Sequence, residues 1–264
     1  MLYGEHHGNP RSAFDSMLPG LIDALGYGGE HPRVVVTGPF AGQIRDEGAF
    51  AEGADLNPRL LQTRTIDEIA ATIEAARHLE IECRYIVNVG AGSIRCIELD
   101  GAMNFRAYRE NSLCAAGTGS FLDEQMHPMG FGYDAVATLA PGIEPPSIAT
   151  RCAVFAKSDL IHRQQEGHTR EELWSGLCRG VVTTMLTTVF RGDVPACPIL
   201  FCGGLFLNPQ AREWVRRAAG RAVFHEHGHF LAAIGAALAG EPEVARETSG
   251  VWTACAGSTI REEG

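Results

Sequence analysis

The sequence of 264 residues lacks the features of several large protein classes. It contains no apolar run of about 18 or more residues, which excludes a transmembrane helix of the usual length. Its first residues, Met1-Leu-Tyr-Gly-Glu-His-His, do not follow the basic and apolar pattern of a secretory signal peptide. No segment repeats at a fixed period, and none is of low complexity. We therefore expect a globular protein of the cytoplasm.

Positive charge is also scarce. The chain carries 22 Lys and Arg residues against 32 Asp and Glu residues, which gives a formal net charge of −10. This balance argues against nucleic acid or an anionic membrane surface as the main partner. What the chain does contain is cysteine, with eight residues. In the cytoplasm these are more typical of metal ligands or buried thiols than of a disulfide framework.

Hydrophobic patterning predicts alternating strands and helices, and therefore an α/β fold. We expect helices over residues 12–25, 65–79, 170–190, 209–219 and 230–239, and two more that begin near Gly119 and Cys152. We expect strands over residues 33–37, 85–89, 93–99, 102–108, 198–202 and 221–224. Asp100-Gly101 indicates a tight hairpin turn, and Thr65 with Glu68 fits a capping box at a helix start.

The first of two glycine turns is Asn88-Val-Gly-Ala-Gly92, which joins two predicted strands. A dinucleotide fingerprint needs a helix here and a third glycine where Arg95 stands, so that interpretation is poor. A hairpin whose turn amides hold a phosphate fits the pattern better. The candidate binding residues are Asn88, Gly90, Ala91 and Gly92, and the alternative is a plain hairpin turn.

The second glycine turn follows the predicted strand 198–202. Gly203 and Gly204 would let the backbone approach a ligand closely, because glycine has no side chain and tolerates unusual backbone angles. Asn208 stands just before Pro209 and is a third candidate for binding. It is equally suited to cap the helix that follows, and capping alone would explain it.

Two cysteines, Cys114 and Cys152, each come immediately before a predicted helix. Cysteine thiolates hold iron–sulfur clusters, and the common clusters take four of them. One chain offers two ligands, so a twofold axis through the cluster would complete the set. Helix N-termini favour negative charge, and glycines 117 and 119 leave amides free to donate toward sulfur. The alternative for each cysteine is a small buried apolar side chain.

A third candidate for metal binding is the alternating set His225, His227 and His229. An extended segment would place the three imidazoles on one face, where they could bind zinc. The segment is also typical of a loop without metal. We interpret the other cysteines as buried or incidental thiols: Cys83, Cys96, Cys178, Cys197, Cys202 and Cys255.

These residues resemble a known family, the ATP-dependent activators of 2-hydroxyacyl-CoA dehydratases and benzoyl-CoA reductases, or BadF/BadG/BcrA/BcrD-type ATPases. The resemblance runs from about Tyr85 to Gly240. The motifs that carry it are Cys114-Ala-Ala-Gly-Thr-Gly with Phe121, Cys152-Ala-Val-Phe-Ala with Ser158, Gly203-Gly204 with Asn208, and Gly235-Ala-Ala-Leu238. The two cysteine motifs are far more specific to the family than the glycine pairs.

The resemblance implies the two-lobed, ribonuclease H-like fold of actin, the sugar kinases and the heat-shock chaperones, with ATP and Mg²⁺ between the lobes. It implies a homodimer that shares one [4Fe-4S] cluster through Cys114 and Cys152 of both subunits. ATP hydrolysis would then drive a low-potential electron to a 2-hydroxyacyl-CoA dehydratase or an aryl-CoA reductase component. On this basis residues 1–84 are a remnant of the N-terminal lobe, residues 85–240 form the second lobe with the cluster-binding segment, and residues 241–264 are a polar tail.

The sequence also departs from the family pattern. No acidic strand–turn–strand precedes Ser12, so we expect the N-terminal lobe to lack its first hairpin. The family has an aspartate where Asn88 stands and Gln-Asp where Gly92-Ser93 stand, and carboxylates are the ligands that Mg²⁺ prefers. Lys157 and Asp159 replace two glutamates. Thr118 and Ser120, after the first cluster cysteine, are expected to cap a helix.

Several hypotheses remain open. The first is a working activator whose ATP site is completed in another way. The second is a cluster-bearing electron-transfer or scaffold subunit with a degenerate ATP site and no hydrolysis. The third is a truncated chain whose first hairpin is encoded upstream. A sugar or acyl kinase of the same superfamily is more remote, because a kinase has no use for the Cys114 motif.

Overall fold

The computed structural model describes residues 8–25, 33–46, 62–111, 118–140, 143–150 and 152–239. The chain forms two compact units, one of Met1–Ala75 with Ala232–Gly264 and one of Ala76–Leu231. The boundaries expected at residues 84 and 240 concern the lobes of the fold and stay predictions.

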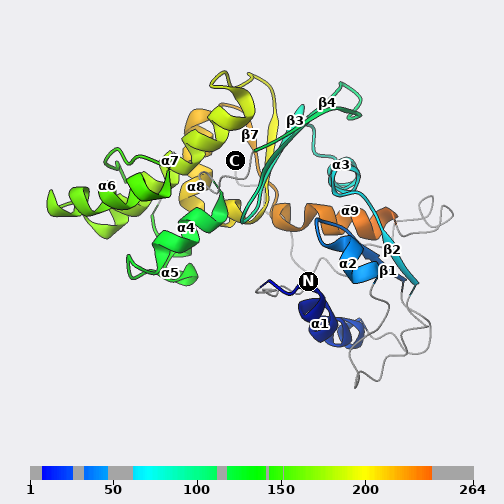
Figure 1. Cartoon of the computed structure of the whole chain (residues 1–264). Helices are drawn as coiled ribbons and strands as arrows, with labels where there is room; N and C mark the ends of the chain where they lie inside the picture. The colour runs from blue at the N-terminus through cyan, green and yellow to red at the C-terminus, as the bar shows by residue number, and fades with distance from the viewer. Residues whose placement is uncertain are drawn as a thin grey trace. The chain divides into compact units, whose positions relative to one another are not determined.

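The larger unit is built on a five-stranded sheet in the order β5-β4-β3-β6-β7 (Figure 1). Its strands are β3 (Tyr85–Val89), β4 (Ile94–Leu99), β5 (Phe105–Glu110), β6 (Ile199–Cys202) and β7 (Ala222–Val223). β3 pairs antiparallel with β4 and parallel with β6, and all four residues of β6 are buried. Because the parallel strands β3 and β6 end at the same edge, the segments that follow them emerge side by side.

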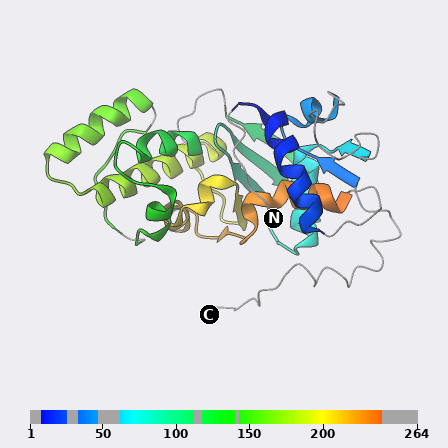
Figure 2. The same ribbon diagram turned by 90° about the horizontal axis from the view of Figure 1, so that it is seen from below.

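The helices of this unit are α4 (Gly119–Met126), α5 (Tyr133–Thr138), α6 (Ala153–Gln165), α7 (Arg170–Phe190) and α8 (Pro209–Ala218), with short 3₁₀ turns η2 (Gly204–Leu207) and η3 (Gly228–Phe230). α7 is the central helix, and its buried residues join those of β3, β4, β6, α4 and α8 in one core. Thr169 caps α7 in a full capping box with Glu172. In Figures 1 and 2 the hairpin of α6 and α7 extends away from the sheet.

The smaller unit contains α1 (Pro10–Ala24), α2 (Ala41–Asp46) and the parallel pair β1 (Arg33–Val36) and β2 (Gln62–Thr65). It also holds most of α3 (Glu68–His78) and of α9 (Leu231–Ala239). α9 packs directly on the backbone of α3, since a Cβ built at Gly235 would lie 1.7 Å from the carbonyl oxygen of Ala71. The glycine of the Gly235-Ala-Ala-Leu238 motif is therefore required by the close contact of two helices.

One expectation about local structure is wrong. Thr65 ends β2, and the amide of Ala70 donates to the side chain of Asp67 at 2.9 Å, so Asp67 replaces the predicted capping box. The hairpin predicted at Asp100-Gly101 is confirmed by the antiparallel pairing of β4 with β5, but its turn is longer than two residues, because the Asp100 carboxylate accepts the amides of Ala102 and Asn104. β5 consequently begins at Phe105. Strand β2 and helices α2 and α5 were not predicted. In the described ranges, no helix is long and apolar enough to cross a membrane.

Gly235→Ala should destabilise the protein, because its methyl group has no room against the Ala71 carbonyl. Overpacking of this kind costs about 1–3 kcal/mol, measured as a lower urea midpoint of unfolding. Gly20→Ala is the matched control, since Gly20 lies in α1 with nothing within 4 Å of an added Cβ. That variant should gain about 0.5–1 kcal/mol from helix propensity. Equal midpoints for the two variants would contradict the helix contact.

Candidate functional site

The two glycine turns meet at the carboxyl edge of β3 and β6. Asn88 and Cys202 are register partners, so Gly90 and Gly203 follow from neighbouring strand ends. Gly203 has φ +98°, and a Cβ there would lie 2.4 Å from the Val89 carbonyl oxygen and 2.6 Å from Asn88 Oδ1. Only glycine fits this position. The structure thus brings Asn88, Gly90 and Gly203 together, as expected of one binding region.

The first glycine turn also holds the start of α4. The amides of Gly119 and Ser120 donate to the carbonyl oxygens of Gly90 and Ala91, at 3.0 and 2.9 Å. The expectation that the Gly119 amide is free to donate toward sulfur is therefore wrong. Thr118 occupies the N-cap position without a capping hydrogen bond, because the turn carbonyls already take these amides. Ala91 and Gly92 are exposed at the tip of the turn, where a ligand can reach them.

The second glycine turn leads through η2 into α8, and Asn208 is the N-cap of that helix. Its Oδ1 accepts the amide of Gln210 at 2.9 Å, which confirms the capping interpretation. Its Nδ2 donates to Cys178 Sγ at 3.3 Å. Burial raises the pKa of the Cys178 thiol to about 12, so this thiol stays neutral. Both ends of Asn208 are thus used inside the protein, and its contact with a nucleotide stays a prediction.

A small pocket opens beside Gly203 and is lined by Phe201, Phe206, Phe224, His225 and His229, among other residues. The three phenyl rings pack against one another with centroids 5.6 to 5.9 Å apart. Burial lowers the pKa of both His225 and His229, so their imidazoles are neutral at neutral pH. The pocket therefore presents aromatic faces, uncharged ring nitrogens and the Arg212 side chain beside the second glycine turn.

The zinc interpretation of the histidine segment is wrong. Across the described ranges, no group of three or more His, Cys, Asp or Glu residues is placed to hold a metal ion. The ring of His229 packs instead on Phe230, with centroids 3.9 Å apart. The amide of His227 donates to His225 Nδ1 at 3.1 Å, so the segment folds back on itself as a loop.

Cys152 lies at the N-cap of α6 and is half-buried. Its carbonyl oxygen accepts the amide of Ala156 at 3.0 Å, while its side chain makes no capping hydrogen bond. The thiol is therefore placed at a helix N-terminus, where the backbone favours a negative ligand. Cys114 lies outside the described residues, so the pairing of the two thiols stays a prediction.

An extended segment of residues 143–150, here called the strap, leads toward Cys152 and lies along α7. Two glycines of α7 make room for it. A Cβ at Gly176 would lie 2.8 Å from Ile148 Cδ1, and one at Gly180 would lie 2.2 Å from Thr150 Cγ2. The hydroxyls of Thr150 and Thr184 are 3.1 Å apart. The strap is thus held in a groove that any larger side chain on α7 would fill.

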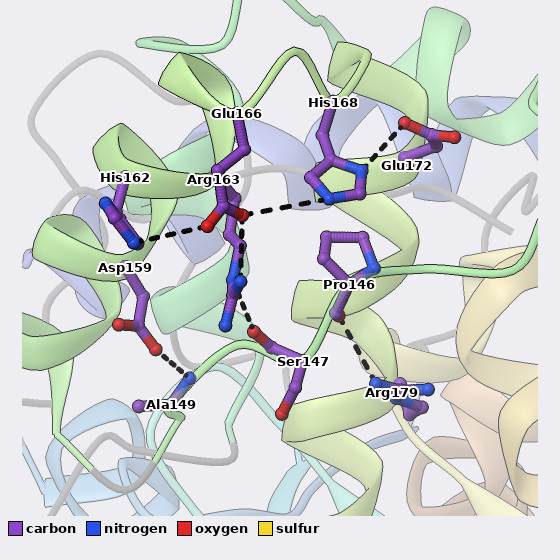
Figure 3. Close-up of polar contacts among 10 residues, drawn as sticks. All are labelled: Pro146, Ser147, Ala149, Asp159, His162, Arg163, Glu166, His168, Glu172 and Arg179. Atoms are coloured by element: carbon purple, nitrogen blue, oxygen red, sulfur yellow. Dashed lines mark hydrogen bonds and ion pairs between the residues drawn. The ribbon is translucent and has the colours of Figure 1, made fainter.

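Helix α6 fastens the other side of the strap through side-chain contacts to its main chain (Figure 3). Asp159 Oδ2 accepts the amide of Ala149 at 2.8 Å, and Arg163 Nε donates to the Ser147 carbonyl at 3.3 Å. Glu166 in turn accepts from Arg163 at 2.8 Å. Sequence reasoning missed this strap, although the small residues Gly176 and Gly180, one turn apart on a predicted helix, were a signal for it.

The remaining cysteines in the described ranges fit the thiol interpretation. Cys83, Cys96 and Cys202 are buried, and burial raises the pKa of both Cys83 and Cys96 to about 11. Cys197 is half-buried. Cys255 lies outside the described residues. Among the described cysteines, Cys152 thus combines partial exposure with a place at the start of a helix.

The BadF/BadG/BcrA/BcrD ATPase family matches residues 11–240. The chain belongs to this family. The chain is 28% identical over 179 residues to the uncharacterized protein YjiL of Escherichia coli K12, which covers 67% of this chain and 70% of YjiL. It is 28% identical over 177 residues to one of the benzoyl-CoA reductase subunits of Thauera aromatica, covering 62% and 61% of the two chains. This sequence thus spans under two thirds of the second relative.

Among solved structures, the chain is similar to the activator of the 2-hydroxyisocaproyl-CoA dehydratase from Clostridium difficile with bound ADPNP. The TM-score is 0.70 at 23% identity, over 94% of this chain and 85% of that one. A likeness at this identity shows the fold. The predicted family and the predicted α/β, actin-like ATPase fold are both confirmed.

The thiols should differ widely in reactivity in the folded, metal-free protein. At pH 8 we expect iodoacetamide to modify Cys152 at least about 100-fold faster than Cys83, Cys96 or Cys178, because buried neutral thiols do not form the reactive thiolate. Peptide mapping by mass spectrometry measures each rate. In urea the four rates should converge. Comparable rates for Cys152 and Cys178 before unfolding would show that the assigned burial is wrong.

Proposed function

We propose that this chain is an ATP-dependent activator that delivers a low-potential electron to a 2-hydroxyacyl-CoA dehydratase or benzoyl-CoA reductase component. The main support for this proposal is the half-buried thiol of Cys152 at the start of α6, in a chain of this ATPase family. A sugar or acyl kinase of the superfamily has no use for that thiol. The names of the relatives support the proposal, since one belongs to a reductase and another activates a dehydratase.

The nucleotide site is proposed to be formed by Asn88, Gly90, Ala91 and Gly92 together with Gly203, Gly204 and Asn208. The exposed tip of the first turn offers backbone N–H groups to phosphate. The second turn, held against β3 by Gly203, would lie under the rest of the nucleotide. This arrangement fits a phosphate-bearing ligand, because neither turn carries a carboxylate that would repel it.

The cluster site is proposed to consist of Cys114 and Cys152 from each of two copies of the chain. The donor set fits, because four thiolates are the usual ligands and one chain offers two. A [4Fe-4S] cluster bound there would supply a one-electron carrier of low potential. The protein's part would be to hold Cys152 at the start of α6, with its half-buried thiol available to a second copy. A homodimer follows as part of the proposal.

Anaerobic reconstitution with iron and sulfide tests the cluster. We expect about two irons and two sulfides per chain in a dimer, since one four-iron cluster serves two chains. Cys152→Ala should bind almost none, while Cys197→Ala, which also removes a half-buried thiol, should keep the full amount. Iron and acid-labile sulfide assays give the result. Full iron in Cys152→Ala would overturn the assignment.

A second candidate is an activator-like protein that binds ATP without hydrolysing it. The observation that favours it is Asn88, whose amide oxygen lies against Gly203 where the related family pattern has a carboxylate. Mg²⁺ would then be held chiefly by nucleotide phosphates and water, because an amide oxygen does not neutralise the cation. Binding of ATP would persist, and turnover would be slow.

Asn88→Asp should raise the Mg²⁺-dependent rate of ATP hydrolysis by about tenfold, equivalent to about 1.4 kcal/mol of barrier. The reason is that a carboxylate supplies the anionic oxygen that Mg²⁺ prefers. Asn9→Asp is the control, since it adds the same charge at the N-cap of α1 and preserves the cap. Phosphate release with and without EDTA measures both. An unchanged rate in Asn88→Asp would argue against a degenerate metal site at this turn.

A further inference from the structure

Helix α8 follows the second glycine turn and is bonded to α7, the helix along which the strap lies. It begins directly after the Gly203–Gly204 turn and η2, and its N-cap Asn208 is bonded to Cys178 of α7. Further along, Gln210 Nε2 donates to the Ala140 carbonyl oxygen at 3.3 Å. One turn later, Trp214 Nε1 donates to Ser175 Oγ of α7 at 3.3 Å. The helix is therefore joined to its neighbours by directional contacts along its length.

The same α7 residues that meet Trp214 also hold the strap. Ser175 Oγ donates to the Ile143 carbonyl oxygen at 3.1 Å, and Arg179 Nη2 donates to the Pro146 carbonyl oxygen at 3.3 Å. Figure 3 shows the contact of Arg179 with Pro146. The Arg179 guanidinium lies 5.5 Å from the centroid of the Trp214 ring. The indole of Trp214 thus contacts both side chains that fix the first half of the strap.

The second half of the strap is fixed to both α7 and α6, the helix that Cys152 precedes. Ile148 packs over Gly176 and Thr150 over Gly180 on α7, and the amide of Ala149 donates to Asp159 on α6. Well-packed segments of this kind move as units, because the interior has no free volume into which single side chains can yield. A shift of α8 would therefore reach the start of α6 through the strap.

We propose that Trp214 is a positioning residue that couples the Gly203–Gly204 turn to Cys152 through Ser175, Arg179 and the strap. This inference rests on the proposed function, because it takes the glycine turn as the place where nucleotide binds. The link combines two hydrogen bonds of Ser175 with the contact of Arg179 on the Trp214 ring in one compact unit, so its contribution can be measured residue by residue.

The test measures alkylation of Cys152 by iodoacetamide in the full-length, metal-free protein, with and without saturating ADP. The affinity for ADP is measured in parallel by calorimetry. In the wild type we expect ADP to change the Cys152 rate at least about fivefold, at the low end of usual coupling between sites. In Trp214→Phe, which keeps a ring under Arg179 and removes the indole N–H, the rates with and without ADP should agree.

Trp174→Phe is the matched control. Trp174 is a buried tryptophan of α7 whose Nε1 has no hydrogen-bond partner among the described residues, so this variant loses packing without losing a bond. It should keep the wild-type effect of ADP. Ser175→Ala alone and combined with Trp214→Phe completes a double-mutant cycle, and the two losses should not add, because both residues act on the same contact.

The outcomes separate the two proposals. Failure of the wild type to bind ADP would overturn the proposed function and this inference together. Binding of ADP with no effect on Cys152, or an unchanged effect in Trp214→Phe, would overturn the inference alone. Loss of ADP binding in Trp214→Phe would also overturn it, because Trp214 would then be needed for the nucleotide site itself rather than for its link to Cys152.

Discussion

The parallel pairing of β3 with β6 is the constraint on which the rest of the larger unit depends. It brings two turns that are far apart in the sequence to one edge of the sheet. The pairing is so close at its end that Gly203 leaves no room for a side chain against Val89 and Asn88. The amides at the start of α4 donate to the first turn, and α8 follows the second turn through η2, so each glycine turn is joined to a helix.

The sequence predicted the regular part of this fold well, because its signals are local. The long apolar periodicity of α7, the Asn208–Pro209 start of α8 and the strands β3 and β6 are all in place. The failures have a common cause in tertiary contact. Thr118 has the residue type of a helix cap, yet the carbonyls of a distant turn take the amides it would have bonded. Thr65 likewise belongs to a strand whose partner lies far back in the chain.

The candidate site likewise has a part that the sequence predicted and a part that it did not. Glycine turns and helix-start cysteines are visible as residue types, so they could be named before the structure. The surroundings of Cys152 could not be predicted in this way. The contacts of the strap join residues that no sequence pattern pairs, such as Ala149 with Asp159 and Pro146 with Arg179. The Lys157 and Asp159 differences from the related pattern illustrate the point, since Asp159 has a structural partner that its identity alone does not reveal.

The strap is fastened mainly through its own backbone. Ile143, Pro146 and Ser147 accept hydrogen bonds with their carbonyl oxygens, and Ala149 donates with its amide. Exposed strap side chains such as Ser147 and Ala149 are therefore free to be exchanged, whereas Gly176 and Gly180 beneath them are not. The exposed side chains next to Cys152 can thus be substituted to recognise a different protein without moving the thiol. This scaffold can therefore change its specificity there with little loss of stability.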